Sequence, residues 1–215
     1  GLLTGIFPEL EMGRGVEQPQ EHYWDVLRHN IETTGTIDRI ISTERLSTDS
    51  AVALVPWTQS VSDHFIGEIS DGFSHRTFLK LAGLLHDLGK PMTRTVESSG
   101  RIRFLGHQDV GADLAVAALR RLRISGKGVR FIETLIRHHL RPGQLAKPGV
   151  LPSRRAIYRY YRDLGETALD TLYLNLSDFL AARGPFLELE DWRIRCEAVK
   201  AVLDGWEENL KTQRL

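Results

Sequence analysis

The chain has 215 residues, 41% of them apolar, and equal numbers of acidic and basic residues, so it is long enough for one generous core or two modest ones. Its one cysteine, Cys196, excludes a disulfide within the chain and a cysteine-based zinc site, and suits a reducing cytoplasm. No apolar run approaches the roughly 18 to 20 residues of a membrane span, and residues 1–20 lack the order of a secretory signal, so we expect a cytoplasmic protein without a membrane partner.

The first third of the chain is the hardest to interpret. Residues 1–20 form a lead-in that begins as if inside a helix, so we expect a domain cut from a longer protein. The apolar spacing predicts a helix from 22 to about 34, and leaves open a continuation to 41. Residues 42–76 read as an insertion or excursion with a short helix at 61–69, because they have too few apolar residues for a core of their own.

The rest of the chain is predicted to be almost entirely helical. A helix from Ser74 to Leu88 is followed by a small hairpin within 93–104. Glycine and proline then separate helices at 107–123, 126–140, 153–163, 165–183 and 188–211. We predict an all-α helical bundle with at most one small β-hairpin near 93–104, forming a single domain over 1–215 in which 185–215 hold the C-terminal helix.

The formal charge of zero conceals a basic middle segment. From Asp113 to Arg162 there are twelve Lys or Arg residues and two acids, so this segment carries +10 and the remainder −10. Such a segment favours a phosphate-bearing partner, although each side chain taken alone fits a solvated helix face. Tyr158, Tyr160 and Tyr161 alternate with arginines there, a pattern that suits base stacking or an amphipathic helix with its tyrosines inward.

The most informative stretch is His86-Asp87-Leu88-Gly89-Lys90-Pro91. Gly89 and Pro91 are poor continuers of a helix, so the apolar helix must end here. Adjacent helical residues point about 100° apart. His86 and Asp87 therefore converge on one ion only if the chain bends at this point, where the helix dipole also favours a cation.

Further histidines and a late aspartate occur on separate predicted helices. One histidine in an apolar helix is usually a satisfied core residue, but here histidines recur at the starts or ends of successive helices. Mixed imidazole and carboxylate ligands suit Mn, Fe, Ni, Co or Zn, with Mg possible in a carboxylate-rich half. The candidate ligands are His29, His86, Asp87, His107, His138 or His139, and Asp178.

The chain resembles the HD-domain metal-dependent phosphohydrolases, and more narrowly the HD domain of bacterial-type tRNA nucleotidyltransferases. The motifs that carry the resemblance are Phe7-Pro8-Glu9-Leu10, Asp25-Val26-Leu27-Arg28-His29-Asn30, Leu84-Leu85-His86-Asp87-Leu88-Gly89-Lys90-Pro91-Met92-Thr93, Phe104-Leu105-Gly106-His107 with Gly111-Ala112, His139-Leu140-Arg141-Pro142, and Asn175-Leu176-Ser177-Asp178. Nothing in the chain matches the nucleotide-transfer motifs of those enzymes' head domain, so we do not expect this piece to add nucleotides by itself.

The resemblance implies one or two divalent ions. The ligands that it implies for the first ion are His29, His86, Asp87 and Asp178. A second ion is expected on His107 and His139, with His138 binding phosphate or exchanging roles with His139.

The implied chemistry is hydrolysis of phosphomonoesters or 2′,3′-cyclic phosphodiesters of nucleotides or RNA 3′ ends, tRNA among them, by a metal-activated water. Asp87 and Lys90 are the expected catalytic residues, and Lys90 and Arg141 are expected to offset phosphate charge. Lys90 also fits a helix cap, and Arg141 a surface salt bridge. Two alternatives remain, a non-catalytic RNA-binding module and a free-standing nucleotidase, and the sequence leaves the oligomeric state open.

Overall fold

The computed structural model describes residues 1–42 and 49–212, with side chains described as far as 206. The predicted excursion at 42–76 and the predicted C-terminal segment at 185–215 therefore lie partly outside the described residues. The α-helices are Leu2–Ile6 (α1), Val26–Ile40 (α2), Ser50–Leu54 (α3), Gln59–Ile66 (α4), His75–Leu85 (α5), Lys90–Thr93 (α6), His107–Arg121 (α7), Gly126–His138 (α8), Arg154–Leu164 (α9), Ala168–Arg183 (α10) and Leu189–Thr212 (α11). Short 3-10 turns occupy Pro8–Gly13, Pro142–Leu145, Gly165–Thr167 and Gly184–Phe186.

The all-α prediction is confirmed, and most of the long helices lie where the apolar spacing placed them. The main shift concerns α2, which begins at Val26 and continues through Gly35 to Ile40. Asp25 is the reason for the late start, because its side chain accepts a hydrogen bond from the Arg28 backbone amide as a helix N-cap does. His22 therefore lies before the helix.

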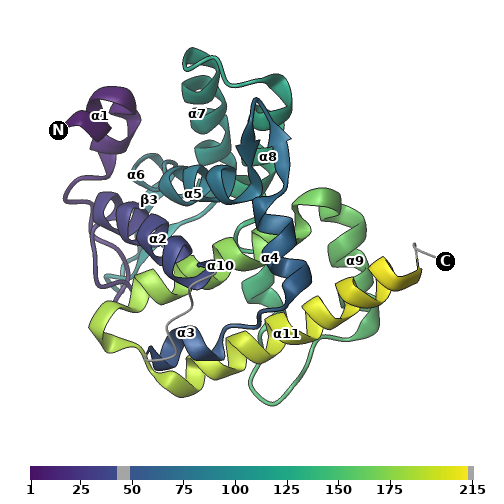
Figure 1. Ribbon diagram of the computed structural model, residues 1–215. Coiled ribbons are helices and arrows are strands. Elements are labelled where there is room, and N and C mark those ends of the chain that lie inside the picture. Colours follow the sequence, from purple (N-terminus) through teal and green to yellow (C-terminus); the bar gives the residue numbers. More distant parts are fainter. Residues whose placement is uncertain (43–48, 213–215) are drawn as a thin grey trace.

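Helix α10 is the centre of the core. Its residues from Ala168 to Ser177 are all buried, the polar Asp170 and Asn175 included, and apolar side chains occur on every face of the helix. Figure 1 shows α10 in the middle of the molecule, with α5 above it and α11 below. Helix α10 packs against α2, α5, α8 and α11, so residues on it are positioned by most of the fold.

Two small antiparallel hairpins accompany the helices in the described residues. The predicted hairpin near 93–104 consists of Arg94–Val96 (β3) and Ile102–Phe104 (β4), with Thr95 opposite Arg103. A second hairpin, Glu68–Ser70 (β1) and Phe73–Ser74 (β2), was not predicted. Its strands are too short for an alternating pattern to be visible in the sequence.

The described part of the excursion joins the main core. Val52, Val61 and Phe65 are buried in the same apolar cluster as α5 and α10. Because these side chains pack against the bundle, α3 and α4 have no separate core. Within the described residues, none of the helices combines the length and the apolar composition that crossing a membrane requires.

Candidate metal centre

The His86-Asp87 pair lies in a tight turn between α5 and α6. The Leu88 amide donates to the Leu85 carbonyl, and the Lys90 amide donates to the Asp87 carbonyl. This is the bend that the sequence required. Because the chain turns here, His86 Nε2 lies 3.2 Å from Asp87 Oδ2, although the two residues are adjacent in the sequence.

Gly89 allows this turn to lie against the start of α7. A Cβ atom at this position would be 2.1 Å from the His107 carbonyl oxygen and 2.6 Å from the Gly111 amide nitrogen. The φ angle of Gly89 is −78°, so space and not backbone conformation excludes a side chain. The close approach brings His107 to the same point as the His86-Asp87 turn.

Three of the histidines are oriented by the same local device. The Nδ1 atoms of His86, His107 and His139 lie 2.8, 2.7 and 2.6 Å from the carbonyl oxygens of the residues three positions earlier. A carbonyl only accepts, so each Nδ1 carries the proton and donates it. Each Nε2 is therefore the nitrogen that can bind a metal through its lone pair, once any proton on it has been released.

The two carboxylate oxygens of Asp87 face two different pairs of imidazoles. Asp87 Oδ2 lies 3.4 Å from His29 Nε2 and 3.2 Å from His86 Nε2. Asp87 Oδ1 lies 3.3 Å from His107 Nε2 and 3.9 Å from His139 Nε2. Asp87 therefore stands between two groups of potential ligands.

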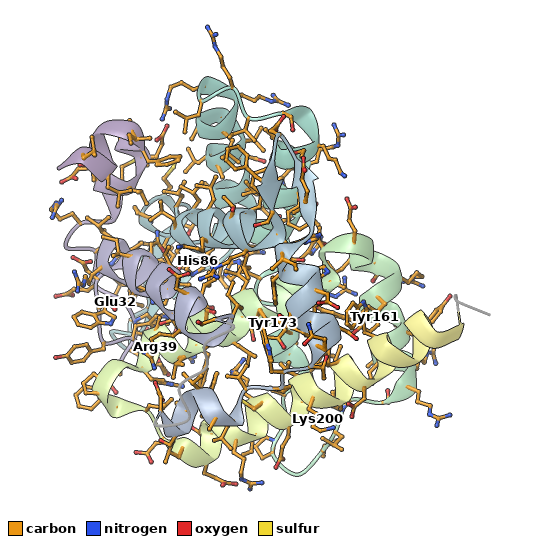
Figure 2. All side chains as sticks on the ribbon, viewed as in Figure 1. Glu32, Arg39, His86, Tyr161, Tyr173 and Lys200 are labelled. Carbon is orange, nitrogen blue, oxygen red and sulfur yellow. The ribbon has the colours of Figure 1, made fainter. Side chains whose placement is uncertain are left out.

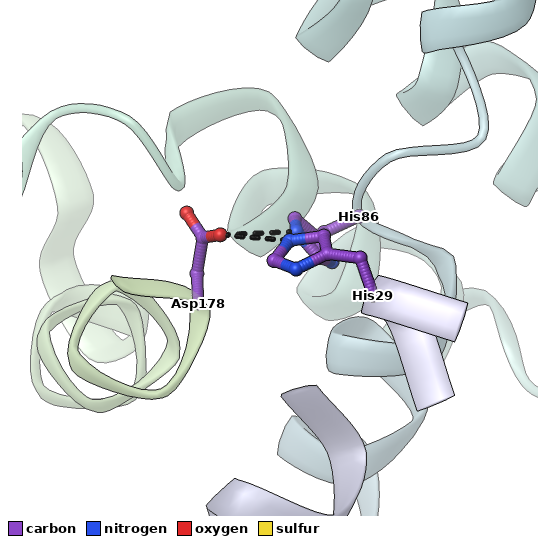
Figure 3. Close-up of side chains that lie close together, drawn as sticks. All are labelled: His29, His86 and Asp178. Atoms are coloured by element: carbon purple, nitrogen blue, oxygen red, sulfur yellow. Dashed lines mark hydrogen bonds and ion pairs between the residues drawn. The ribbon is translucent and has the colours of Figure 1, made fainter. Parts of the chain in front are cut away.

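Asp178 completes the first group from the other side. It projects from α10 toward His29 of α2 and His86, as Figure 3 shows. Its Oδ1 lies 3.0 Å from His29 Nε2 and 3.6 Å from His86 Nε2. The structure thus brings together all six residues for which metal binding was expected, from five separate elements or turns. His86, which Figure 2 labels, is fully buried.

The donor set fits a bound divalent cation. His86 Nε2 and Asp87 Oδ1 are buried and have no hydrogen-bond partner among the described residues. Buried polar atoms are normally satisfied, and a cation between them would satisfy both. Imidazole nitrogens mixed with carboxylates suit borderline transition ions.

The charges of the cluster also call for a cation. Burial raises the pKa of Asp87 and of Asp178, but neighbouring imidazoles and, at Asp87, the Lys90 ammonium lower both pKa values well below the ordinary range. Burial lowers the pKa of His86, yet the two carboxylates raise it to about 10. In the metal-free protein a proton on His86 Nε2 therefore supplies the positive charge that an ion supplies when bound.

Lys90 belongs to the same cluster. It is the first residue of α6 and is 5% exposed, and its ammonium pairs with side chains of Asp87 and Gln18, which differs from a cap on the preceding helix. Its Nζ lies 2.6 Å from Asp87 Oδ2 and 2.6 Å from the side-chain oxygen of Gln18. Sequence reasoning missed Gln18, because it lies in the irregular lead-in.

A cavity of about 660 Å³ opens onto the cluster. Asp87, Lys90, His107, His139 and Asp178 lie in its wall. That volume is of the size that binds small molecules. The basic residues that line it are Lys90, Arg101, Arg103, Arg183 and Arg195.

Arg195 of α11 is a further cavity residue that the sequence did not single out. It donates from Nη1 to the Asn175 side-chain oxygen at 2.9 Å, and the Asn175 amide donates to the His139 carbonyl at 2.9 Å. Its buried Nε has no hydrogen-bond partner, and no ion pair to a described carboxylate is present. Arg195 thus lies in the cavity wall, although its part of the chain carries no motif.

Two expected substrate-binding residues are not brought to this cavity. His138 is the last residue of α8 and lies outside the cavity lining, because it points about 100° away from its neighbour His139. Arg141 forms an ion pair with Asp163 of α9, which is the surface alternative considered above.

None of the Lys or Arg residues of the basic segment at 113–162 lines the cavity, although His139 of that segment does. Within this segment Tyr160 and Tyr161 face inward, where their hydroxyls donate to the carbonyls of Ala168 and Val202. Only Tyr158 of the three tyrosines is exposed, at 66%. The alternative of an amphipathic helix with its tyrosines inward therefore holds for Tyr160 and Tyr161 but not for Tyr158.

Comparison with known proteins agrees with this geometry. The family model described as "HD domain" matches residues 64–183. The chain is 38% identical over 117 residues to the CC-adding tRNA nucleotidyltransferase of Thermus thermophilus, covering 54% of this chain and 25% of that protein. It is 31% identical over 188 residues to the A-adding tRNA nucleotidyltransferase of Deinococcus radiodurans, covering 86% of this chain and 34% of that protein. The chain thus spans about a quarter to a third of the length of these relatives.

Proposed function

Because this chain belongs to the HD domain family, we propose that it is a metal-dependent phosphohydrolase acting on phosphomonoesters or 2′,3′-cyclic phosphodiesters of nucleotides or RNA 3′ ends. The observation that carries the proposal is the position of Asp87, whose two oxygens face two separate pairs of imidazoles. A carboxylate in that position suits two neighbouring divalent ions, the arrangement that phosphoryl-transfer sites use.

The ions are proposed to lie on either side of Asp87. On one side are His29, His86 and Asp178, and on the other are His107 and His139, so that with Asp87 they make up the six-residue ligand set expected from the sequence. When bound, such ions lower the pKa of water and neutralise charge on phosphate oxygens. The donor set is compatible with Mn, Fe, Ni, Co, Zn and Mg.

The chain's own residues supply binding and orientation. Lys90, held by Asp87 and Gln18, places a fixed positive charge at the inner wall of the cavity. Arg195 also lines the cavity, and a guanidinium is well suited to phosphate. The carbonyl bonds to Nδ1 hold the imidazoles of His86, His107 and His139 in one orientation, so these three need little rearrangement on binding.

The cavity chemistry favours an anionic substrate. Five basic side chains line the cavity, and two of its three acids, Asp87 and Asp178, belong to the proposed metal cluster. Once cations occupy that cluster, the remaining lining is strongly positive. A phosphate group on a nucleotide or at an RNA end matches this charge.

The second candidate is a non-catalytic RNA-binding module. It is favoured by the names of the two relatives, both tRNA nucleotidyltransferases, and by exposed basic residues on α9 away from the cavity. Arg154, Arg155 and Arg159 are exposed there and flank the exposed Tyr158. A charged surface with one aromatic side chain suits the RNA backbone.

Hydrolysis assays separate the two candidates. We expect the purified protein to hydrolyse bis-p-nitrophenyl phosphate and 2′,3′-cyclic AMP when Mn²⁺ or Ni²⁺ is added, and Asp87→Ala to abolish this activity. His138→Gln is the matched control, because its imidazole lies outside the cavity, and it should retain the activity. RNA retention by an intact protein that hydrolyses neither compound would favour the binding module.

A further inference from the structure

A second cluster of two histidines and one aspartate lies away from the cavity. His64 is in the last turn of α4, His75 is the first residue of α5, and Asp170 is in the first turn of α10. His64 Nε2 lies 2.7 Å from Asp170 Oδ2, and His75 Nδ1 lies 3.0 Å from the same oxygen. The two imidazole rings are only 3.9 Å apart between centroids. None of the three residues lines the cavity.

Asp170 is a buried carboxylate with no Lys or Arg partner among the described residues. Its exposure is 0%, and the ion pairs found among the described residues join it to His64 and His75 but to no Lys or Arg. Burial alone would raise the pKa of Asp170, but hydrogen bonds from the two imidazoles lower it below its ordinary value. The helix dipole at the start of α10 helps a carboxylate there, but a full buried charge normally has a full countercharge.

The donor atoms are arranged as metal ligands are. One nitrogen from each imidazole and one carboxylate oxygen all lie within 4.8 Å of one another, on three different helices. Zinc commonly takes three such protein ligands and completes its coordination with water. Water can reach the site, because the His64 and His75 side chains are 15% and 16% exposed.

We propose that His64 Nε2, His75 Nδ1 and Asp170 form a second, separate binding site for a divalent transition-metal ion such as Zn²⁺. The ion replaces the imidazole protons that otherwise face the carboxylate and supplies the missing countercharge. The ion joins α4 and the start of α5 to the helix that also carries Asp178. The two aspartates are eight residues apart, so the site fixes α10 about 12 Å along its axis from the first cluster.

Equilibrium dialysis of the whole chain against micromolar Zn²⁺, followed by metal analysis, tests this proposal. We expect His75→Asn and Asp170→Asn each to lose one equivalent of zinc relative to the wild type. Asp178→Asn, which alters only the first cluster, should keep that equivalent, and added zinc should raise its unfolding temperature. Anomalous scattering at the zinc edge should show a peak between His64, His75 and Asp170 in both the wild type and Asp178→Asn.

Zinc binding that is identical in the wild type and His75→Asn would overturn the proposal, and so would a wild-type crystal with no anomalous peak at this cluster. In either case the three residues are joined by hydrogen bonds alone. If His75→Asn fails to fold, His64→Asn is the replacement, since His64 is at the end of α4 and partly exposed. The outcome is independent of the hydrolase proposal, because the two clusters share no residue and zinc is counted at each separately.

Discussion

Replacing Gly89 by alanine should be among the most damaging single-methyl changes in this chain. The added Cβ would be 2.1 Å from the His107 carbonyl oxygen, whereas ordinary contact begins at 3.4 Å, so the turn and the start of α7 must separate by more than an ångström. Overpacking of this kind usually costs about 1–3 kcal/mol, and backbone on both sides places Gly89→Ala at or above the upper end. At about 2–4 °C per kcal/mol, the unfolding temperature should fall by roughly 6–12 °C.

Gly35→Ala is the matched control. Gly35 lies in the exposed middle of α2, and a Cβ there would meet nothing within 4 Å. Alanine should therefore stabilise the protein by up to about 1 kcal/mol, because glycine is the poorer helix former. Both variants are measured by urea and thermal unfolding in EDTA, so that bound metal does not contribute. If Gly89→Ala unfolds within about 0.5 kcal/mol of the wild type, the close approach of the turn to α7 is wrong.

Four further predictions concern the proposed active site. The pKa of His86 is about 10 in the metal-free protein, so protons compete with the metal for its Nε2. Calorimetry from pH 6 to 8 should therefore show that metal affinity rises with pH and that metal binding releases protons. A metal affinity that is independent of pH would contradict the competition at His86. Without metal, the stabilisation from His86 should be complete below pH about 6.5 and decline as pH rises toward about 10, which urea unfolding at several pH values measures. Lys90→Met should lower kcat by roughly 10²–10³ in steady-state assays while tightening metal binding, since it removes a positive charge beside Asp87; weaker metal binding would contradict that view. Arg195→Met should raise KM about tenfold with little change in kcat, whereas Arg193→Met, an exposed arginine of the same helix, should change neither.

Four of the six candidate ligands could be located from local patterns in the sequence, whereas His29 and Asp178 lie inside α2 and α10 and carry no such pattern. The His86-Asp87 pair followed by Gly89 requires a bend, and the bend is present. His107 and His139 likewise stand at the start of α7 and just after α8. The boundaries of α2 were less predictable, since the choice between His22 and Asp25 as the start depends on an N-cap hydrogen bond.

The cavity wall was not predictable in the same way. Gln18 and Arg195 reach it from an irregular segment and from the C-terminal helix, and neither carries a motif. The basic segment at 113–162 was the obvious candidate for phosphate binding, yet the cations at the cavity come from other parts of the chain. Net charge along the sequence does not indicate which face a charge will occupy, because that depends on how the helices pack.

The orientation of the imidazoles and their meeting at one point have different physical origins. The orientation of His86, His107 and His139 is local, since each Nδ1 donates to a carbonyl three residues earlier, a bond that any such helix end can form. Their meeting is global, and it depends on a turn in which Gly89 has no room for a side chain. A chain that lost Gly89 would therefore keep three correctly oriented imidazoles but separate them. Metal affinity should then fall while the individual helices persist, which distinguishes damage to the meeting point from damage to the ligands.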